Sequence, residues 1–304
     1  MRNYLLILSV LMVTAIIVGT YYYQNLEHNY TLPQLNLRNN LQEETPNEIE
    51  NTPLQPVNDD PISYSLQNDE LTITYNKGKD WIKVPVDKNL LFNGEYQGNK
   101  QELIEGSYVL SEERLAFLYK QVGLNMKYTT DQGNTWQDSV IAEEFPELRF
   151  RKIAFLNDSF GYVIVSGDRT MSQEYSTVFL TFDSGKTWTK TEDPPTTRMI
   201  AFGSFVDEKT GFLSYGTINP EAPDVYVTQD GGKVWRHARL SIPAPYGKVF
   251  VQAEAPFIEE DHLAVLVNQG PNGDYEGGLV KGKFISKDNG LTWEFLQEVE
   301  PDEG

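Results

Sequence analysis

One short pattern, in which an acidic or amide residue is followed by Gly and then by Trp, recurs five times in the 304-residue chain. Carboxylates at such positions could ligate a hard cation, act as general acids or bases, or accept hydrogen bonds from their own turn. One site does not need five copies, so we interpret the motif as structural and expect no catalytic residue and no metal site in it. The motif positions are Asn76, Gly78, Trp81, Asp131, Gly133, Trp136, Asp183, Gly185, Trp188, Asp230, Gly232, Trp235, Asp288, Gly290 and Trp293.

The full pattern is Ser/Thr-x-Asp-x-Gly-x-x-Trp in four copies, and the first copy has Asn76 in place of Asp. This pattern resembles the Asp-box, also called the bacterial neuraminidase repeat. The resemblance implies a β-propeller in which each copy forms the turn between the third and fourth strands of a blade. The repeats are also similar to those of photosystem II assembly factor propellers and of the sortilin ectodomain, which implies a protein-binding role.

The spacing of the copies predicts the elements that must position them. Successive acidic positions lie 55, 52, 47 and 58 residues apart (76 to 131, 131 to 183, 183 to 230 and 230 to 288), which is the length of a four-stranded blade with its loops. We therefore predict an all-β β-propeller over residues 61–304, with five blades favoured and six as the alternative. The first blade is expected to be short, with strands at 62–66, 71–75 and 81–85.

The N-terminal segment predicts a membrane anchor followed by a tether. Residues 1–23 contain an almost wholly apolar run preceded by Arg2, which is typical of a single transmembrane helix with a cytoplasmic N-terminus. Residues 24–60 are rich in Asn, Gln, Glu, Thr and Pro and are expected to be a flexible linker. The propeller would then be extracytoplasmic at the cell membrane. The alternative is a cleaved signal peptide and a secreted domain.

Composition excludes several classes of function. The formal net charge of −19 disfavours nucleic acid as a partner, because phosphates would be repelled. The absence of cysteine excludes disulfides and thiolate chemistry. We see no zincin, nucleophile-elbow or phosphate-loop motif, and we expect no cofactor.

The long loops of the predicted blades fall on the face opposite the Asp-box turns, and loops on a rigid scaffold often carry function. These loops are expected at 168–175, 217–225 and 268–281, with crossovers at 191–198 and 241–247. The candidate binding face comprises Arg151, Arg169, Tyr175, Arg198, Tyr246, Asp274, Tyr275 and Glu276. Loop anchoring and solvated strand ends are the ordinary interpretations of such residues.

The resemblance to sialidases implies a catalytic set that this sequence does not match. Such an enzyme needs three arginines around the substrate carboxylate, a Tyr nucleophile with a Glu partner, and an Asp acid/base. The family's Arg-Ile-Pro motif is missing, and no arginine lies between Arg38 and Arg114. We therefore expect a non-enzymatic binding or assembly module for a protein or peptide partner at the cell surface. A glycan-directed protein, either a divergent glycosidase or a lectin-like binder, is the alternative.

Overall fold

The computed structural model describes residues 53–300, and every structural statement below concerns these residues. The predicted transmembrane helix at 1–23, and the predicted linker as far as residue 52, lie outside the described residues. None of the helices within 53–300 combines the length and the apolar character that crossing a membrane requires.

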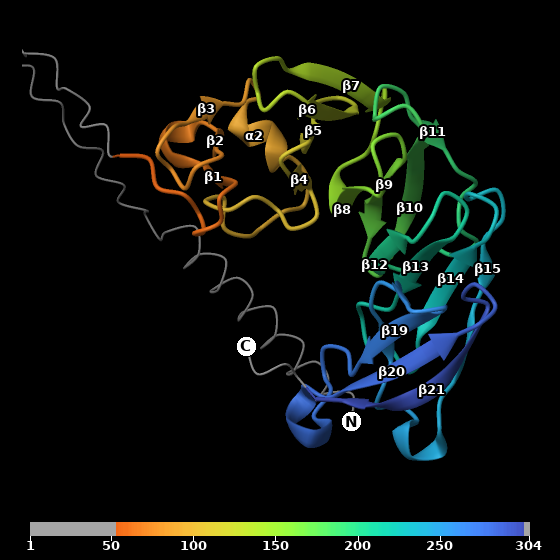
Figure 1. Cartoon of the computed structure of the whole chain (residues 1–304). Helices are drawn as coiled ribbons and strands as arrows, with labels where there is room; N and C mark the ends of the chain where they lie inside the picture. The colour runs from red at the N-terminus through yellow and green to blue at the C-terminus, as the bar shows by residue number, and fades with distance from the viewer. Residues whose placement is uncertain (1–52, 301–304) are drawn as a thin grey trace, which may run out of the picture. The chain divides into compact units, whose positions relative to one another are not determined.

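Five β-sheets follow one another in chain order in the described part of the chain, and most of their strands pair antiparallel with sequence neighbours (Figure 1). Sheet 1 contains β1 (Ser63–Ser65), β2 (Thr72–Thr74) and β3 (Ile82–Lys83). Sheet 2 contains β4 (Tyr108–Leu110), β5 (Leu115–Lys120), β6 (Leu124–Thr129) and β7 (Gln137–Ala142). Sheet 3 contains β8 (Leu148–Phe155), β9 (Gly161–Thr170), β10 (Gln173–Thr181) and β11 (Thr189–Lys190).

Sheet 4 contains β12 (Ile200–Phe205), β13 (Gly211–Tyr215), β14 (Asp224–Thr228) and β15 (Arg236–His237). Sheet 5 contains β16 (Arg239–Ser241), β17 (Gln252–Ala253), β18 (Phe257–Glu259), β19 (His262–Asn268), β20 (Lys281–Ser286) and β21 (Thr292–Val299). The short helices are η1 (Gln67–Asp69), α2 (Lys88–Leu91), η2 (Ala244–Tyr246) and η3 (Tyr275–Gly278). The predicted all-β class is confirmed. The blade count stays a prediction, because part of the chain lies outside the described residues.

Apolar side chains on both faces of the sheets hold neighbouring sheets together. Each of four hydrophobic clusters joins one sheet to the next: sheets 1 and 2, 2 and 3, 3 and 4, and 4 and 5. Within residues 53–300 no such cluster includes both sheet 1 and sheet 5. β-Branched and aromatic residues dominate the buried strands, because their side chains pack well on a pleated surface. The result is a stiff series of sheets that can hold turns in fixed positions.

Two local features differ from the sequence-based expectations. The predicted loop at 168–175 is largely strand, because β9 and β10 continue as a hairpin almost to Met171, which is almost fully exposed at the tip. In sheet 5, the chain leaving sheet 4 contributes β16 as an outer strand that pairs parallel with β21. Neither the long β9–β10 hairpin nor the parallel pairing of β16 could be predicted from the pattern of short apolar segments in the sequence.

Candidate functional site

Each of the five repeats forms a turn held by its own hydroxyl and carboxyl or amide group. In the third repeat, the Thr181 hydroxyl donates to Asp183 Oδ1 at 2.9 Å and accepts from the Gly185 N–H at 2.8 Å. Asp183 Oδ1 also accepts from the Thr187 N–H at 2.9 Å. In each of the other four turns, the glycine N–H likewise donates to the Ser or Thr hydroxyl, and a later backbone N–H donates to the Asp or Asn side-chain oxygen. The turns are therefore built by local hydrogen bonds, as the repetition predicts.

The spacing shared by the five repeats places glycine where the backbone is left-handed. The five repeat glycines have φ between +78° and +86°. Except in the first copy, the space where a Cβ would lie is occupied by the preceding sheet: Ile82 for Gly133, Met126 for Gly185, Thr191 beside β11 for Gly232, and Phe212 for Gly290. Glycine thus permits both the turn and its close contact with the neighbouring sheet.

The carboxylates of the repeats are committed to these turns. Hydrogen bonds from the Thr135 side chain and backbone lower the pKa of Asp131 to about 2, and the equivalent bonds from Thr187 lower the pKa of Asp183 to about 2. An acid this strong stays ionised at neutral pH and is a poor proton donor there. Among the described residues no group of three or more His, Asp or Glu side chains could hold a metal ion.

These lowered pKa values predict a specific acid sensitivity. Since Asp131 and Asp183 bind protons more weakly in the folded chain than in the unfolded chain, they stabilise the fold above about pH 4. That stabilisation is lost as pH falls from about 4 towards about 2. We expect the urea midpoint to fall over this window, and to fall less steeply in Asp183→Asn. An unchanged slope in the variant would contradict this role.

The candidate face predicted from sequence divides into two groups in the structure. In the first group, Arg169 forms an ion pair with Glu95, and Arg198 forms one with Asp224 at 2.6 Å. Tyr175 is 61% exposed beside them on β10. Most of these charges are therefore already matched within the protein.

Arg151, also predicted for this face, is buried. Its guanidinium donates to the carbonyls of Leu91 and Asn93 at 2.9 Å each. The chain after α2 therefore covers this arginine, although the prediction placed it on an open binding face.

The second group lies on sheet 5. The hydroxyl of Tyr275 donates to Glu298 at 2.8 Å, which raises the pKa of Tyr275 to about 12. Tyr246 packs against the Tyr275 ring, whereas Asp274 and Glu276 are exposed in the same loop. The loops 217–225 and 268–281 meet through a hydrogen bond between the side chains of Asn272 and Asn219 at 2.9 Å. None of the principal cavities of the described chain includes these predicted residues.

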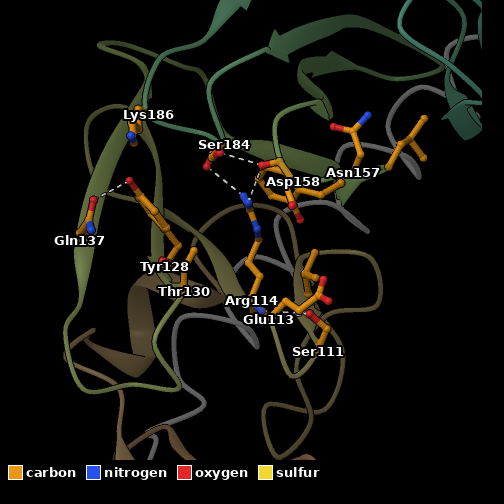
Figure 2. Close-up of a pocket in the computed structure, with 13 residues that line it drawn as sticks. Ser111, Glu113, Arg114, Tyr128, Thr130, Gln137, Asn157, Asp158, Ser184 and Lys186 are labelled. Carbon is orange, nitrogen blue, oxygen red and sulfur yellow. Dashed lines mark hydrogen bonds between the residues drawn. The ribbon is translucent and has the colours of Figure 1, made fainter.

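Three of these cavities lie instead along the face that carries the repeat turns. Cavity A, of about 560 Å³, lies between sheets 2 and 3. It is bordered by the β4–β5 and β8–β9 hairpin turns and by two repeat turns. Figure 2 shows Arg114 extending from the first hairpin towards Ser184 and Asp158 on sheet 3. The remaining polar lining residues include Ser111, Glu113, Thr130, Gln137, Asn157 and Lys186.

Two further cavities continue from cavity A along the same face. Cavity B, of about 570 Å³, shares Leu156 and Asn157 with cavity A. Cavity C, of about 250 Å³, shares Asp207 and Asn289 with cavity B. The three cavities thus lie in a row past the β4–β5, β8–β9, β12–β13 and β18–β19 hairpin turns, and we call this row of cavities the turn groove. A row of three cavities beside four sheets suits an extended ligand better than a small molecule.

The turn groove combines exposed aliphatic side chains with charges of both signs. Leu156, 42% exposed, lines cavities A and B, and Ile258, 62% exposed, lines cavity C. The charged lining residues are Glu113, Asp158, Asp207, Glu208, Glu260, Asp261, Arg114, Lys186, Lys209 and Lys287. The sequence carried one usable signal for this surface: each inner hairpin turn contains charged or amide residues at the same place in the repeat.

The sheets, their order and the five repeat turns define the class of protein: a β-propeller. A family model described as the DUF6242 beta propeller domain matches residues 20–268, and the chain belongs to that family. No curated protein matches the sequence.

Solved structures resemble the chain at low identity. The GH74 xyloglucanase of Xanthomonas campestris is 14% identical over 80% of this chain and 38% of its own, with a TM-score of 0.47. YCF48 of Cyanidioschyzon merolae is 12% identical over 76% of this chain and 64% of its own, with a TM-score of 0.43. The NanB sialidase of Streptococcus pneumoniae is 17% identical over 67% of this chain and 32% of its own, with a TM-score of 0.34. The chain thus spans less than two thirds of each of these three proteins.

Proposed function

We propose that the protein is a non-catalytic binding module that holds an extended segment of a protein partner in the turn groove. The observation that carries this proposal is the row of cavities A, B and C, in which neighbouring cavities share lining residues beside four sheets. The stiff sheets would present this groove already formed, which lowers the entropy cost of binding.

The chemistry of the groove favours a peptide over a glycan. Leu156 and Ile258 offer aliphatic contacts, and both acidic and basic side chains line the three cavities. Peptide side chains supply matching partners for both. The aromatic rings in cavities A and B offer a sugar little open surface: Arg114 covers one face of Phe155, and Phe160 and Tyr128 are buried.

Substitution of an exposed groove residue tests the location of the site. In full-length protein panned against a displayed library of random peptides, we expect Ile258→Asp to weaken the selected peptides about tenfold or more. The reason is that a charge replaces an aliphatic contact in cavity C. Because Ile258 is 62% exposed, the free energy of unfolding should change little.

Leu279→Asp is the matched control, because Leu279 is 64% exposed in the long loop 268–281. It should leave peptide affinity near wild type. If Leu279→Asp weakens binding and Ile258→Asp does not, the ligand lies on the long-loop face instead. Failure to select any peptide, together with binding or hydrolysis in a glycan and glycoside panel, would favour the glycan-directed alternative.

The expected location, with a membrane-anchored and extracytoplasmic propeller, remains part of this proposal. A protease added to intact cells would digest an extracytoplasmic domain and spare a cytoplasmic one.

A further inference from the structure

Arg114 is a buried cation in the wall of cavity A. Its side chain reaches from the β4–β5 turn across to sheet 3, as Figure 2 shows. Nη1 donates to the Ser184 carbonyl at 2.9 Å and Nη2 donates to the Asp158 carbonyl at 3.0 Å. The guanidinium carbon lies 3.7 Å from the centre of the Phe155 ring, and the residue as a whole is only 8% exposed.

This cation has no carboxylate partner within residues 53–300. Three other arginines of the described chain, Arg149, Arg169 and Arg198, each form an ion pair. Arg114 binds backbone carbonyls only, and its Nε makes no hydrogen bond within the described chain. A buried charge is normally paired, because leaving water is costly without a counter-charge.

Arg151 provides the contrast that separates a structural arginine from one open to a ligand. It too binds only carbonyls, but it is 3% exposed and lines none of the principal cavities of the described chain. Arg114 lines about 560 Å³ of open space. Burial lowers the pKa of Arg114, and the nearby charge of Asp158 partly offsets that effect. A bound anion would, like Asp158, raise the pKa of Arg114 and so stabilise its charged form.

We propose that cavity A is a carboxylate subsite, in which Arg114 receives one Asp or Glu side chain of the bound peptide. This inference rests on the proposed peptide-binding function and adds the chemistry of one position of the ligand. The exposed Lys186 at the same cavity supplies a second cation. Glu113 and Asp158 also line the cavity, so a singly charged carboxylate fits better than a doubly charged phosphate.

Peptides selected on the full-length protein test the subsite. We expect them to share one acidic position, and replacing that residue by Asn or Gln should weaken binding to wild type about tenfold. The same replacement should have no further effect on binding to Arg114→Gln, whereas Arg114→Lys should retain part of the preference. Lys186→Gln should reduce the preference several-fold. Lys79→Gln, an exposed lysine of the first repeat turn outside the groove, is the control.

Several outcomes would overturn the inference. Selected peptides with no shared acidic position would do so, as would an acid-to-amide effect of equal size in wild type and in Lys186→Gln. This second variant keeps the test open if Arg114→Gln does not fold. Binding of acetate at matched ionic strength, without selection of any peptide, would assign the site to small free carboxylates.

These results also separate the two proposals. Peptides that depend on Ile258 but lack an acidic position overturn the subsite alone. Selection of no peptide overturns the binding function.

Discussion

Gly290→Ala should lower the free energy of unfolding by about 3 kcal/mol, the sum of a left-handed backbone cost and an overpacking cost. Gly290 has φ +86°, and an added Cβ would lie 2.2 Å from a ring carbon of Phe212. Phe212 is almost fully buried in the cluster that joins sheets 4 and 5, so the ring cannot move aside without opening that cluster. Urea unfolding followed by tryptophan fluorescence measures the effect.

Gly277→Ala is the control that isolates the steric part. Gly277 has φ +80°, but no atom lies within 4 Å of its added Cβ. Only the backbone cost remains, and we expect a loss of about 1 kcal/mol. Equal losses in the two variants would show that the contact between the turn and the preceding sheet contributes nothing.

Glu174→Ala should also be strongly destabilising, by about 3–5 kcal/mol, because it leaves one member of a buried ion pair without its partner. The Glu174 side chain is fully buried, forms an ion pair with Arg149, and accepts the Ile200 N–H at 2.8 Å. These contacts tie β10 of sheet 3 to the first strand of sheet 4. Denaturant unfolding of the purified variant measures the change.

Two further variants serve as comparisons: one removes an exposed ion pair, and the other replaces both members of the buried pair. Glu70→Ala removes an exposed ion pair with Lys83 and should cost less than about 1 kcal/mol. Arg149→Met combined with Glu174→Met should be more stable than Glu174→Ala, because neither charge is then left alone in the interior. A loss in Glu174→Ala no larger than in Glu70→Ala would mean that the pair does not hold the sheets together.

Much of the fold could be predicted from local sequence. The expected strands at 62–66, 71–75 and 81–85 correspond to β1, β2 and β3. Turn chemistry and alternation of buried residues are local properties, so the sequence displays them directly. The extended β9–β10 hairpin and the parallel β16 depend on pairing across the chain, which local patterns do not encode.

The candidate site was harder to predict, because its determinants come from distant segments. The prediction favoured long loops, whereas the continuous groove is built by short inner hairpins of successive sheets. Arg114 and Ser184 are 70 residues apart in sequence. Arg151 looked like a strand end open to ligand, but the segment after α2 covers it. The sequence alone does not show whether a charged side chain is solvated, paired or buried.

Four of the five repeat glycines pack on the sheet before them, so these contacts between sheets all run in one direction along the chain. A sheet can complete its turn contact only after the preceding sheet exists, and the ribosome releases the sheets in that order. The first repeat has no earlier sheet among the described residues, and Pro56 lies in the equivalent place, 3.3 Å from the position of an added Cβ on Gly78. Pro56, just before sheet 1, thus takes the place that the preceding sheet occupies at the other repeat turns. A shortened protein that began after Pro56 would lose the surface on which the first turn packs.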